Sequence, residues 1–182
     1  MHACRHKVLV IGVGSIGERH LRCFQATGRA ELSLVEINAS LRQAVAERYG
    51  IRQAFAELEA ALKDRPDAAV IAPPAHLHVT LATRLAEAGV HILIEKPLST
   101  TLAGIERLRQ VLHERPVVAA LAYVYRCHPL LAAMRHAIRA GRFGRPVELV
   151  AVCGQHFPTY RPAYRSIYYT DRNTGGGAIQ DA

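Results

Sequence analysis

The sequence predicts an α/β fold in which a doubly wound parallel sheet is covered by helices on both faces. Short apolar runs of strand length alternate along the chain with amphipathic stretches of helix length. The apolar runs are almost continuous, as in "KVLVIG" and "DAAVIAPP", which is typical of strands buried on both faces of a parallel sheet. The 182 residues suffice for one such domain and part of a second.

The first half of the expected sheet begins close to the N-terminus. Residues 6–27 read as a strand, a tight glycine turn and a helix, and residues 31–37 form an apolar second strand. An amphipathic helix at 40–50 ends at Gly50, because glycine readily takes the left-handed conformation that closes a helix. The next expected elements are a short strand at 52–55 and a helix at 57–63.

Proline and glycine stops mark the second half of the sheet. A continuous apolar strand at 67–74 is broken by its two final prolines, which have no N–H to give to a strand ladder. A helix at 76–89 ends at Gly89. The remaining expected elements are a strand at 90–95, a helix at 101–115 and a strand at 116–125.

The composition changes near residue 122, where we place a domain boundary. A helix at 128–144 and a long strand at 145–157 lead into a segment at 158–177 that is rich in tyrosine and arginine. This segment is too polar and aromatic to be plain core. The expected organisation is a first domain at 1–122 and the start of a second domain at 123–182.

Charge and hydropathy exclude several classes of protein. The formal charge of +8 comes mostly from arginines that are scattered along the chain. This distribution argues against nucleic acid as a partner and favours a basic surface that suits anionic ligands. No apolar run approaches the roughly 18 residues that a membrane-spanning helix requires. We therefore expect no nucleic acid and no membrane among the partners.

The cysteines indicate neither a zinc site nor a redox pair, because none of them forms a C-x-x-C motif. They are expected to be reduced packing residues in a cytoplasmic protein. The four positions are Cys4, Cys23, Cys127 and Cys153.

A glycine pattern of the form G-x-G-x-x-G follows the first strand and opens the first helix. The first glycine permits the turn, the second lets a pyrophosphate approach the backbone, and the third lets helix and strand pack closely. The N-terminus of the helix then favours the phosphates. We expect a dinucleotide-binding Rossmann domain, the alternative being a merely structural turn. The residues are Gly12, Val13, Gly14, Ser15, Ile16 and Gly17.

Glu36 ends the second strand at the interval from the glycines where an acidic residue binds an adenosine ribose. Its carboxylate can accept both ribose hydroxyls, and its charge would repel a 2′-phosphate, so the sequence predicts NAD rather than NADP. Arg42 lies close enough in sequence to leave NADP open. The alternative for Glu36 is a solvated glutamate at a strand end.

The prolines Pro73 and Pro74 end a strand at the edge where ligands of doubly wound sheets bind, so we expect them at the cofactor. His76 and His78 are spaced as H-x-H, but no carboxylate or cysteine lies nearby to complete a metal site. We therefore predict no metal, and expect His78 to brace the loop against the cofactor.

The stretch "ILIEKPLS" places Glu95 and Lys96 where an apolar strand ends, on the same edge as the glycine loop. A lysine beside a nicotinamide, partly desolvated, can take the proton that leaves an alcohol as hydride leaves its carbon. We expect Lys96 to be catalytic and to contact both cofactor and substrate, with Glu95 at the cofactor as well. The alternative is an ordinary surface lysine after a strand. We also expect a cis bond before Pro97.

The combination of "VIGVGSIGERHL", "APPAHLH", "AGVHILIEKPLS", "YVYRCHP" and "TGGGAIQD" resembles the Gfo/Idh/MocA oxidoreductase family over essentially all 182 residues. The resemblance implies a Rossmann domain followed by a larger α+β domain with an open sheet, which would serve substrate binding and oligomerisation. It also implies NAD(P)-dependent oxidation or reduction of hydroxyl groups on sugars, inositols and related polyols. A homo-oligomer formed through the second domain is expected.

The resemblance assigns roles to particular residues. Lys96 resembles the catalytic lysine, and Asp181 resembles the catalytic aspartate of a G-G-G-x-x-x-D pattern. Arg126 and Pro129 match an R-x-x-P element near the domain junction, which places Arg126 at the substrate. The histidine that normally follows the aspartate by four residues has no counterpart before Ala182. We therefore expect these residues to belong to a chain about twice as long, with most of the second domain outside them.

The segment before the final glycines suggests the kind of substrate. Tyr160, Arg161 and Arg165 lie in "HFPTYRPAYRSIYY". Arginine binds carboxylate and phosphate in pairs of hydrogen bonds, and tyrosine rings pack against sugars. We expect these residues to bind an anionic sugar, the alternative being that the tyrosines pack a sheet or a subunit interface. Two other functions stay open: a non-catalytic sensor of the NAD redox state, and a dihydrodiol or tetrapyrrole reductase of the same family.

Overall fold

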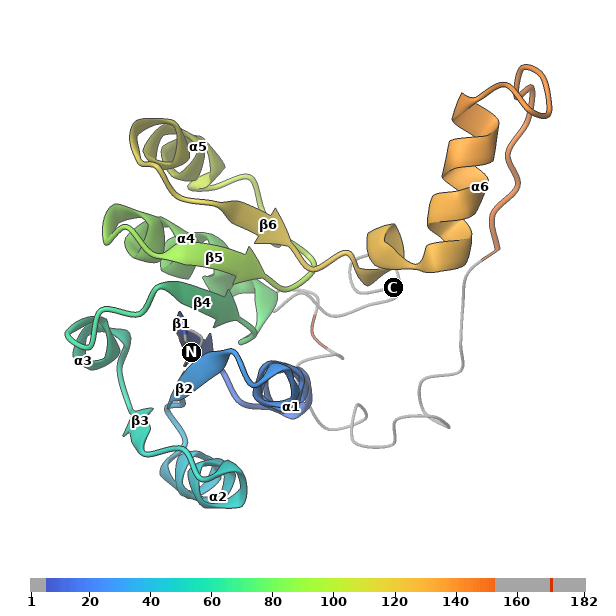
Figure 1. The fold of residues 1–182 in the computed structure, drawn as a ribbon. Coiled ribbons are helices and arrows are strands. Elements are labelled where there is room, and N and C mark those ends of the chain that lie inside the picture. The colour runs from blue at the N-terminus through green and yellow to red at the C-terminus, as the bar shows by residue number, and fades with distance from the viewer. Residues whose placement is uncertain (1–5, 153–170, 172–182) are drawn as a thin grey trace.

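Figure 1 shows the chain as a computed structural model, which describes residues 6–152 and residue 171. The strands are β1 (His6–Ile11), β2 (Ala30–Val35), β3 (Gln53–Phe55), β4 (Ala68–Ile71), β5 (His91–Ile94) and β6 (Ala119–Leu121). The α-helices are α1 (Ser15–Thr27), α2 (Ala39–Tyr49), α3 (Leu58–Leu62), α4 (His78–Glu87), α5 (Ile105–Glu114) and α6 (Pro129–Arg139). Two 3₁₀ turns, η1 (Ala75–Leu77) and η2 (Val124–Cys127), precede α4 and α6.

The strands form one parallel sheet in the order β3-β2-β1-β4-β5-β6. This is the strand order of a Rossmann domain, in which the direction of winding reverses between β1 and β4. The predicted doubly wound parallel sheet is confirmed. Ligands of such sheets bind outside the carboxyl ends of the strands at that reversal, so the fold itself indicates where a cofactor belongs.

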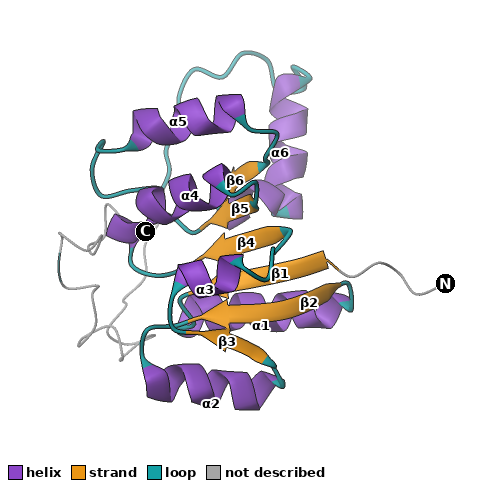
Figure 2. Ribbon diagram, turned by 90° about the vertical axis from the view of Figure 1, so that its left-hand side faces the viewer, coloured by secondary structure: helices purple, strands orange, loops and turns teal. Residues whose placement is uncertain are grey.

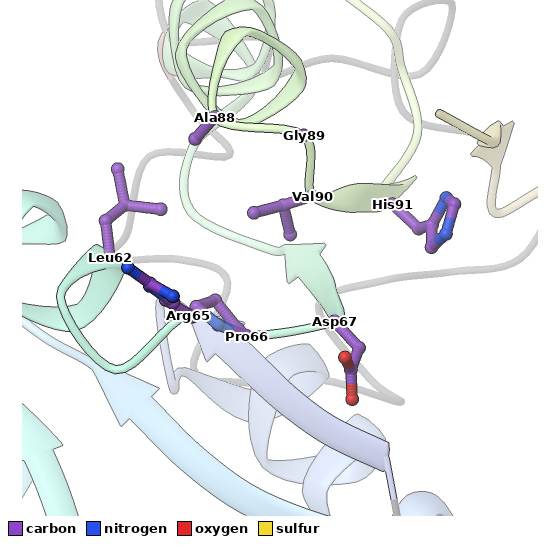
Figure 3. Close-up of a pocket in the computed structure, with 8 residues that line it drawn as sticks. All are labelled: Leu62, Arg65, Pro66, Asp67, Ala88, Gly89, Val90 and His91. Carbon is purple, nitrogen blue, oxygen red and sulfur yellow. The ribbon is translucent and has the colours of Figure 1, made fainter. Parts of the chain in front are cut away.

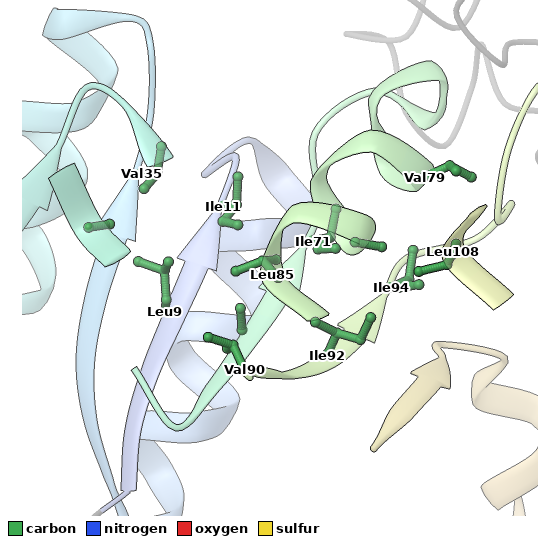
Figure 4. Packing of buried hydrophobic residues seen from close by; sticks show 13 residues of the cluster. Leu9, Ile11, Val35, Ile71, Val79, Leu85, Val90, Ile92, Ile94 and Leu108 are labelled. Atoms are coloured by element: carbon green, nitrogen blue, oxygen red, sulfur yellow. The ribbon is translucent and has the colours of Figure 1, made fainter. Parts of the chain in front are cut away.

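Apolar side chains fill both faces of the sheet, because each strand sends alternate residues to opposite sides. Val8 and Val10 of β1 pack with α1 and α2 on one face. Leu9 and Ile11 pack on the other face with α3, α4 and α5. Figure 2 shows the helices on both sides of the sheet, and Figure 4 shows the second of these cores. The nearly continuous apolar strands of the sequence reflect this double burial.

The last strand is shorter than the sequence predicts. Of the expected strand at 116–125, only β6 (Ala119–Leu121) is observed. Its partner β5 is itself only four residues long and limits the pairing. The N–H of Ala122 still bonds the carbonyl of Ile94 at 2.8 Å, after which the chain turns into η2. The helix expected at 101–115 likewise starts later, at Ile105, since Gly104 has a φ of 78° that no right-handed helix contains.

The long strand expected at 145–157 is wrong over its described part. Residues 145–152 have no regular secondary structure. A strand needs a neighbour that pairs with its N–H and C=O groups, and none of the described strands pairs with this segment. The predicted boundary near residue 122 stays a prediction. Beyond it, α6 extends past the end of β6 (Figure 1), and none of its residues is buried.

Among the described residues, no helix has the combination of length and apolar character that crossing a membrane requires.

Candidate active site

The carboxyl ends of β1, β4 and β5 bring three predicted segments to one edge of the sheet. The glycine loop follows β1, the two prolines follow β4, and Glu95 follows β5. Backbone hydrogen bonds join these ends, from Ala72 N–H to the Ile11 carbonyl at 2.9 Å and from Glu95 N–H to the Ile71 carbonyl at 2.9 Å. The sheet therefore assembles residues that lie more than 80 positions apart in the sequence.

A different steric requirement explains the glycine at each of the three positions of the loop. A Cβ on Gly12, whose φ is 75°, would lie 2.7 Å from the Pro73 nitrogen, so the loops after β1 and β4 meet here. A Cβ on Gly17 would lie within 1.8 Å of the Gly12 carbonyl oxygen, so α1 packs directly onto the loop. A Cβ on Gly14 would meet nothing within 4 Å. That open space is what the approach of a pyrophosphate requires.

The start of α1 is open to an anion. Gly14 is the N-cap residue, and no side chain caps the helix. The first N–H groups of a helix have no partner within the helix, and together with the helix dipole they favour phosphate. Gly14 and Ser15 are exposed, whereas Val13 is fully buried in the core. The side chain of Val13 therefore packs in the core. Val13 can contact a ligand only through its backbone.

Glu36 stands at the end of β2 beside the glycine loop. One carboxylate oxygen accepts a hydrogen bond from Val13 N–H at 3.0 Å, and the other accepts one from Asn38 N–H at 3.0 Å. Each oxygen keeps a second lone pair that can accept a ribose hydroxyl. The Arg42 guanidinium donates to the backbone carbonyl of Glu36 at 2.6 Å. Arg42, the residue that leaves NADP open, therefore lies directly beside Glu36. The residues present thus fit a dinucleotide.

His78 joins the loops after β4 and β5. Its ring is 1% exposed. Its two nitrogens lie 2.8 Å from the carbonyl oxygens of Pro73 and Pro97. A neutral imidazole carries only one N–H, so the ring donates to both carbonyls at once only when it is doubly protonated. His78 therefore braces these two loops against each other, and the expected cis bond is present between Lys96 and Pro97.

Glu95 is held by the protein on both of its oxygens. One lies 2.7 Å from Nε2 of His20, on α1, and the other accepts the N–H of Lys96 at 3.1 Å. Burial alone would raise the pKa of the Glu95 carboxyl, but the hydrogen bond and charge of His20, with the amide and charge of Lys96, outweigh burial and lower that pKa. Glu95 is therefore ionised at neutral pH, directly beside Lys96.

Comparison with known proteins identifies the family. Residues 6–123 match the family described as "Oxidoreductase family, NAD-binding Rossmann fold". This match covers well over half of the chain. The chain belongs to the Gfo/Idh/MocA oxidoreductase family.

Relatives in this family include dehydrogenases of sugars and polyols. Levoglucosan dehydrogenase of Pseudarthrobacter phenanthrenivorans is 30% identical over 94% of this chain and 47% of its own length. Inositol 2-dehydrogenase 1 of Saccharopolyspora erythraea is 36% identical over 78% of this chain and 43% of its own length. The chain spans about half the length of the curated relatives it matches.

Solved structures of the family resemble the fold. The WlbA dehydrogenase from Bordetella pertussis, in complex with NADH and UDP-GlcNAcA, matches with a TM-score of 0.71 and 30% identity, over 78% of this chain and 44% of that one. A levoglucosan dehydrogenase in complex with NADH and levoglucosan matches with a TM-score of 0.71 and 28% identity, over 78% and 41% of the two chains.

The other predicted site residues of this family member lie after β6. Arg126 lies on η2 beyond β6 with its side chain exposed. The substrate residues expected at Tyr160, Arg161 and Arg165, and the catalytic Asp181, lie outside the described residues. Their roles stay predictions, as do those of the residues at the sheet edge. Within the described part of the chain, no cluster of three or more His, Cys, Asp or Glu side chains could hold a metal ion.

Sequence analysis did not single out His20. The sequence feature that could have indicated His20 is its position three residues after the last glycine of the loop. This position places His20 on the first turns of α1, near the edge where Glu95 was expected. A hollow at the opposite edge of the sheet is unrelated to this site (Figure 3). Its lining includes Asp67, just before β4, and His91, the first residue of β5, so it lies at the amino ends of these strands and faces away from the glycine loop.

Proposed function

We propose that the protein transfers a hydride between NAD and a hydroxyl-bearing carbon of a sugar or polyol. The observation that carries the proposal is the position of Lys96 at the carboxyl end of β5, next to the point where the sheet reverses and on the edge that holds the glycine loop. An amine at this edge can accept a proton during alcohol oxidation, because a proton must leave the oxygen as hydride leaves the carbon.

NAD, when bound, supplies the hydride acceptor. The residues of the chain bind and orient it: the open space at Gly14 and the uncapped start of α1 favour its phosphates, and Glu36 accepts its ribose hydroxyls. The negative charge of Glu36 disfavours a 2′-phosphate, which supports NAD over NADP. Lys96 takes the proton from the substrate hydroxyl in oxidation and returns it in reduction.

The names of the relatives support a sugar-like substrate. Levoglucosan, inositol and UDP-N-acetylglucosamine appear in the names of the dehydrogenases that this chain resembles. We favour an anionic sugar for two reasons. Arg161 and Arg165 are predicted to bind the substrate, and the chain carries a formal charge of +8.

The exposed apolar side chains of α6, with Leu130 at 74% and Met134 at 52% exposure, support a homo-oligomer that forms through the second domain. Cys23 and Cys127 are exposed, so the expectation that they pack the core is wrong for these two cysteines. A cytoplasmic location stays part of the proposal, because cysteines remain reduced there.

Replacing Lys96 tests the proposal. NADH binding is measured on the chain itself by fluorescence, and turnover with NAD is measured on the full-length gene product with a panel of neutral and anionic sugars. Lys96→Met is expected to lower kcat by about 10²- to 10⁴-fold while NADH binding stays mostly intact. Lys63→Met, at an exposed lysine after α3, is the matched control.

Near-normal turnover of Lys96→Met would contradict the proposed chemistry. Tight NADH binding by the wild type without turnover of any sugar or polyol would instead indicate a sensor of the NAD redox state. Turnover of dihydrodiols or tetrapyrroles alone would point to the non-sugar reductases. Equal activity on neutral and anionic sugars would count against the anionic preference.

A further inference from the structure

Lys96 lies between two residues that histidines hold in place. On one side, the carboxylate of Glu95 is bound by His20 of α1 at 2.7 Å. On the other side, the carbonyl oxygen of Pro97 lies 2.8 Å from Nδ1 of the buried His78, at the start of α4. The two helices lie on opposite faces of the sheet. The backbone around Lys96 is therefore anchored from both faces at once.

The anchor from α1 continues into Lys96 itself. The Glu95 oxygen that does not face His20 accepts the N–H of Lys96 at 3.1 Å. A rotation of the Glu95 side chain would therefore break a hydrogen bond of the Lys96 backbone. His20 blocks this rotation, because its Nε2 holds the other oxygen of the same carboxylate.

The His20–Glu95 contact is sheltered from solvent. The two side chains are 18% and 14% exposed. By contrast, the ion pair of Arg84 with Glu59 on the surface is 44% and 60% exposed. Exposed ion pairs contribute little, whereas a sheltered pair with one partner removed leaves a carboxylate poorly solvated. Loss of His20 should therefore cause the Glu95 side chain to change its conformation.

The contact also connects two parts of the site. His20 stands on the helix whose first turn is expected to bind the cofactor phosphates, and Glu95 precedes the expected proton-transfer lysine. The sequence separates them by 75 positions.

We propose that His20 is a positioning residue, which fixes Lys96 through Glu95 and ties its placement to the cofactor-binding helix. This inference rests on the proposed function for its catalytic consequence, but the placement of Lys96 can be measured separately. A merely structural His20 would stabilise the domain as a whole without a particular effect at Lys96.

Amide hydrogen exchange on the chain itself measures the placement. In His20→Leu, which keeps a side chain of similar size without a donor, the Lys96 amide is expected to exchange about 10-fold faster. The amides of Leu9 and Val70, in the core strands β1 and β4, are expected to keep their rates. His113→Leu, at an exposed position of α5, is the matched control.

Kinetics on the full-length gene product measure the consequence. His20→Leu is expected to lower kcat on the order of 10- to 100-fold, as a displaced catalytic group does, with the Kd for NADH unchanged. His20→Gln keeps an N–H donor that reaches the place of Nε2, and is expected to restore most of both the kcat and the slow exchange at Lys96.

An unchanged Lys96 amide in His20→Leu would overturn the proposal, as would equal acceleration of all amides. A normal kcat in His20→Leu, with Lys96→Met inactive, would overturn it as well. If Lys96→Met retains full turnover, the proposed function fails, and the exchange experiment still decides whether His20 fixes Lys96.

Discussion

The carboxylate of Glu36 accepts the N–H of Val13 at 3.0 Å, which joins the end of β2 to the glycine loop after β1. The carboxylate is thereby oriented by the same loop that is expected to bind the phosphates. Its second oxygen is held by the N–H of Asn38. This geometry sets the acidic group in place within the protein, so that little ordering is needed when a ribose binds.

Replacement of Glu36 by serine should shift the cofactor preference. Because the carboxylate offers charged acceptors to the ribose hydroxyls and repels a 2′-phosphate, Glu36→Ser is expected to weaken NADH binding by about 10-fold or more. Binding of NADPH should improve. Fluorescence titration with both cofactors measures the change, with Glu31→Ser, at an exposed position of β2, as the control. Tighter NADPH than NADH binding by the wild type would show that this role of Glu36 is wrong.

Alanine at Gly14 and at Gly17 should act differently. Gly17→Ala would drive a Cβ into the Gly12 carbonyl, and backbone against backbone cannot move aside, so we expect destabilisation of about 3 kcal/mol or more. Gly14→Ala meets nothing within 4 Å and should leave the Tm nearly unchanged. It should nevertheless weaken NADH binding, because the methyl group occupies space that the phosphates need. Thermal unfolding and NADH titration separate the two effects, and equal behaviour of both variants would contradict this account.

Removal of the His78 ring should destabilise the domain. His78→Ala removes the buried ring that lies 2.8 Å from the carbonyls of Pro73 and Pro97, and the loss of one hydrogen bond to a carbonyl there costs about 1–3 kcal/mol. Urea unfolding followed by circular dichroism gives the change. His76→Ala, two residues earlier and exposed, should stay within about 0.5 kcal/mol of the wild type. Similar stabilities of the two variants would exclude the bracing role.

The lowered pKa of Glu95 predicts a pH-dependent contribution to stability. A carboxyl whose folded pKa lies below its unfolded pKa stabilises the fold above the unfolded value, and this contribution is lost as pH falls through the folded value. The difference in unfolding free energy between wild type and Glu95→Gln should therefore be larger near neutral pH than at about pH 3. Urea unfolding at both pH values measures it. A difference that stays constant, or grows toward acid, would refute the assignment.

The apolar face of α6 should cause self-association of these 182 residues. Leu130, Met134 and Ile138 follow one another at intervals of four and share one side of the helix, with exposures of 74%, 52% and 38%. Leu130→Glu with Met134→Glu should shift the chain toward the monomer in light scattering after gel filtration. Arg135→Glu, an exposed charge on the same helix, should leave the association state unchanged. A monomeric wild type would contradict the prediction.

The sequence by itself determined the architecture and the edge that holds the site. Strand-length apolar runs, glycine and proline stops and the spacing of Gly12, Gly14 and Gly17 are local signals, because they depend on backbone conformation and on burial of a whole segment. They predict a parallel sheet, and in such a sheet the strands must end at one edge. Glu36 and Lys96 could therefore be assigned to a common edge without knowledge of any contact.

Only the tertiary structure decided which side chains meet at that edge. The contact of His20 with Glu95 depends on how α1 is rotated on the sheet and on how far β5 extends, and neither follows from local periodicity. The tertiary structure also showed that His78 holds the loops after β4 and β5 together, and that β6 stops at Leu121, where its pairing with β5 ends. Such contacts join segments far apart in the chain, so their geometry exists only once the sheet has set the distances between them.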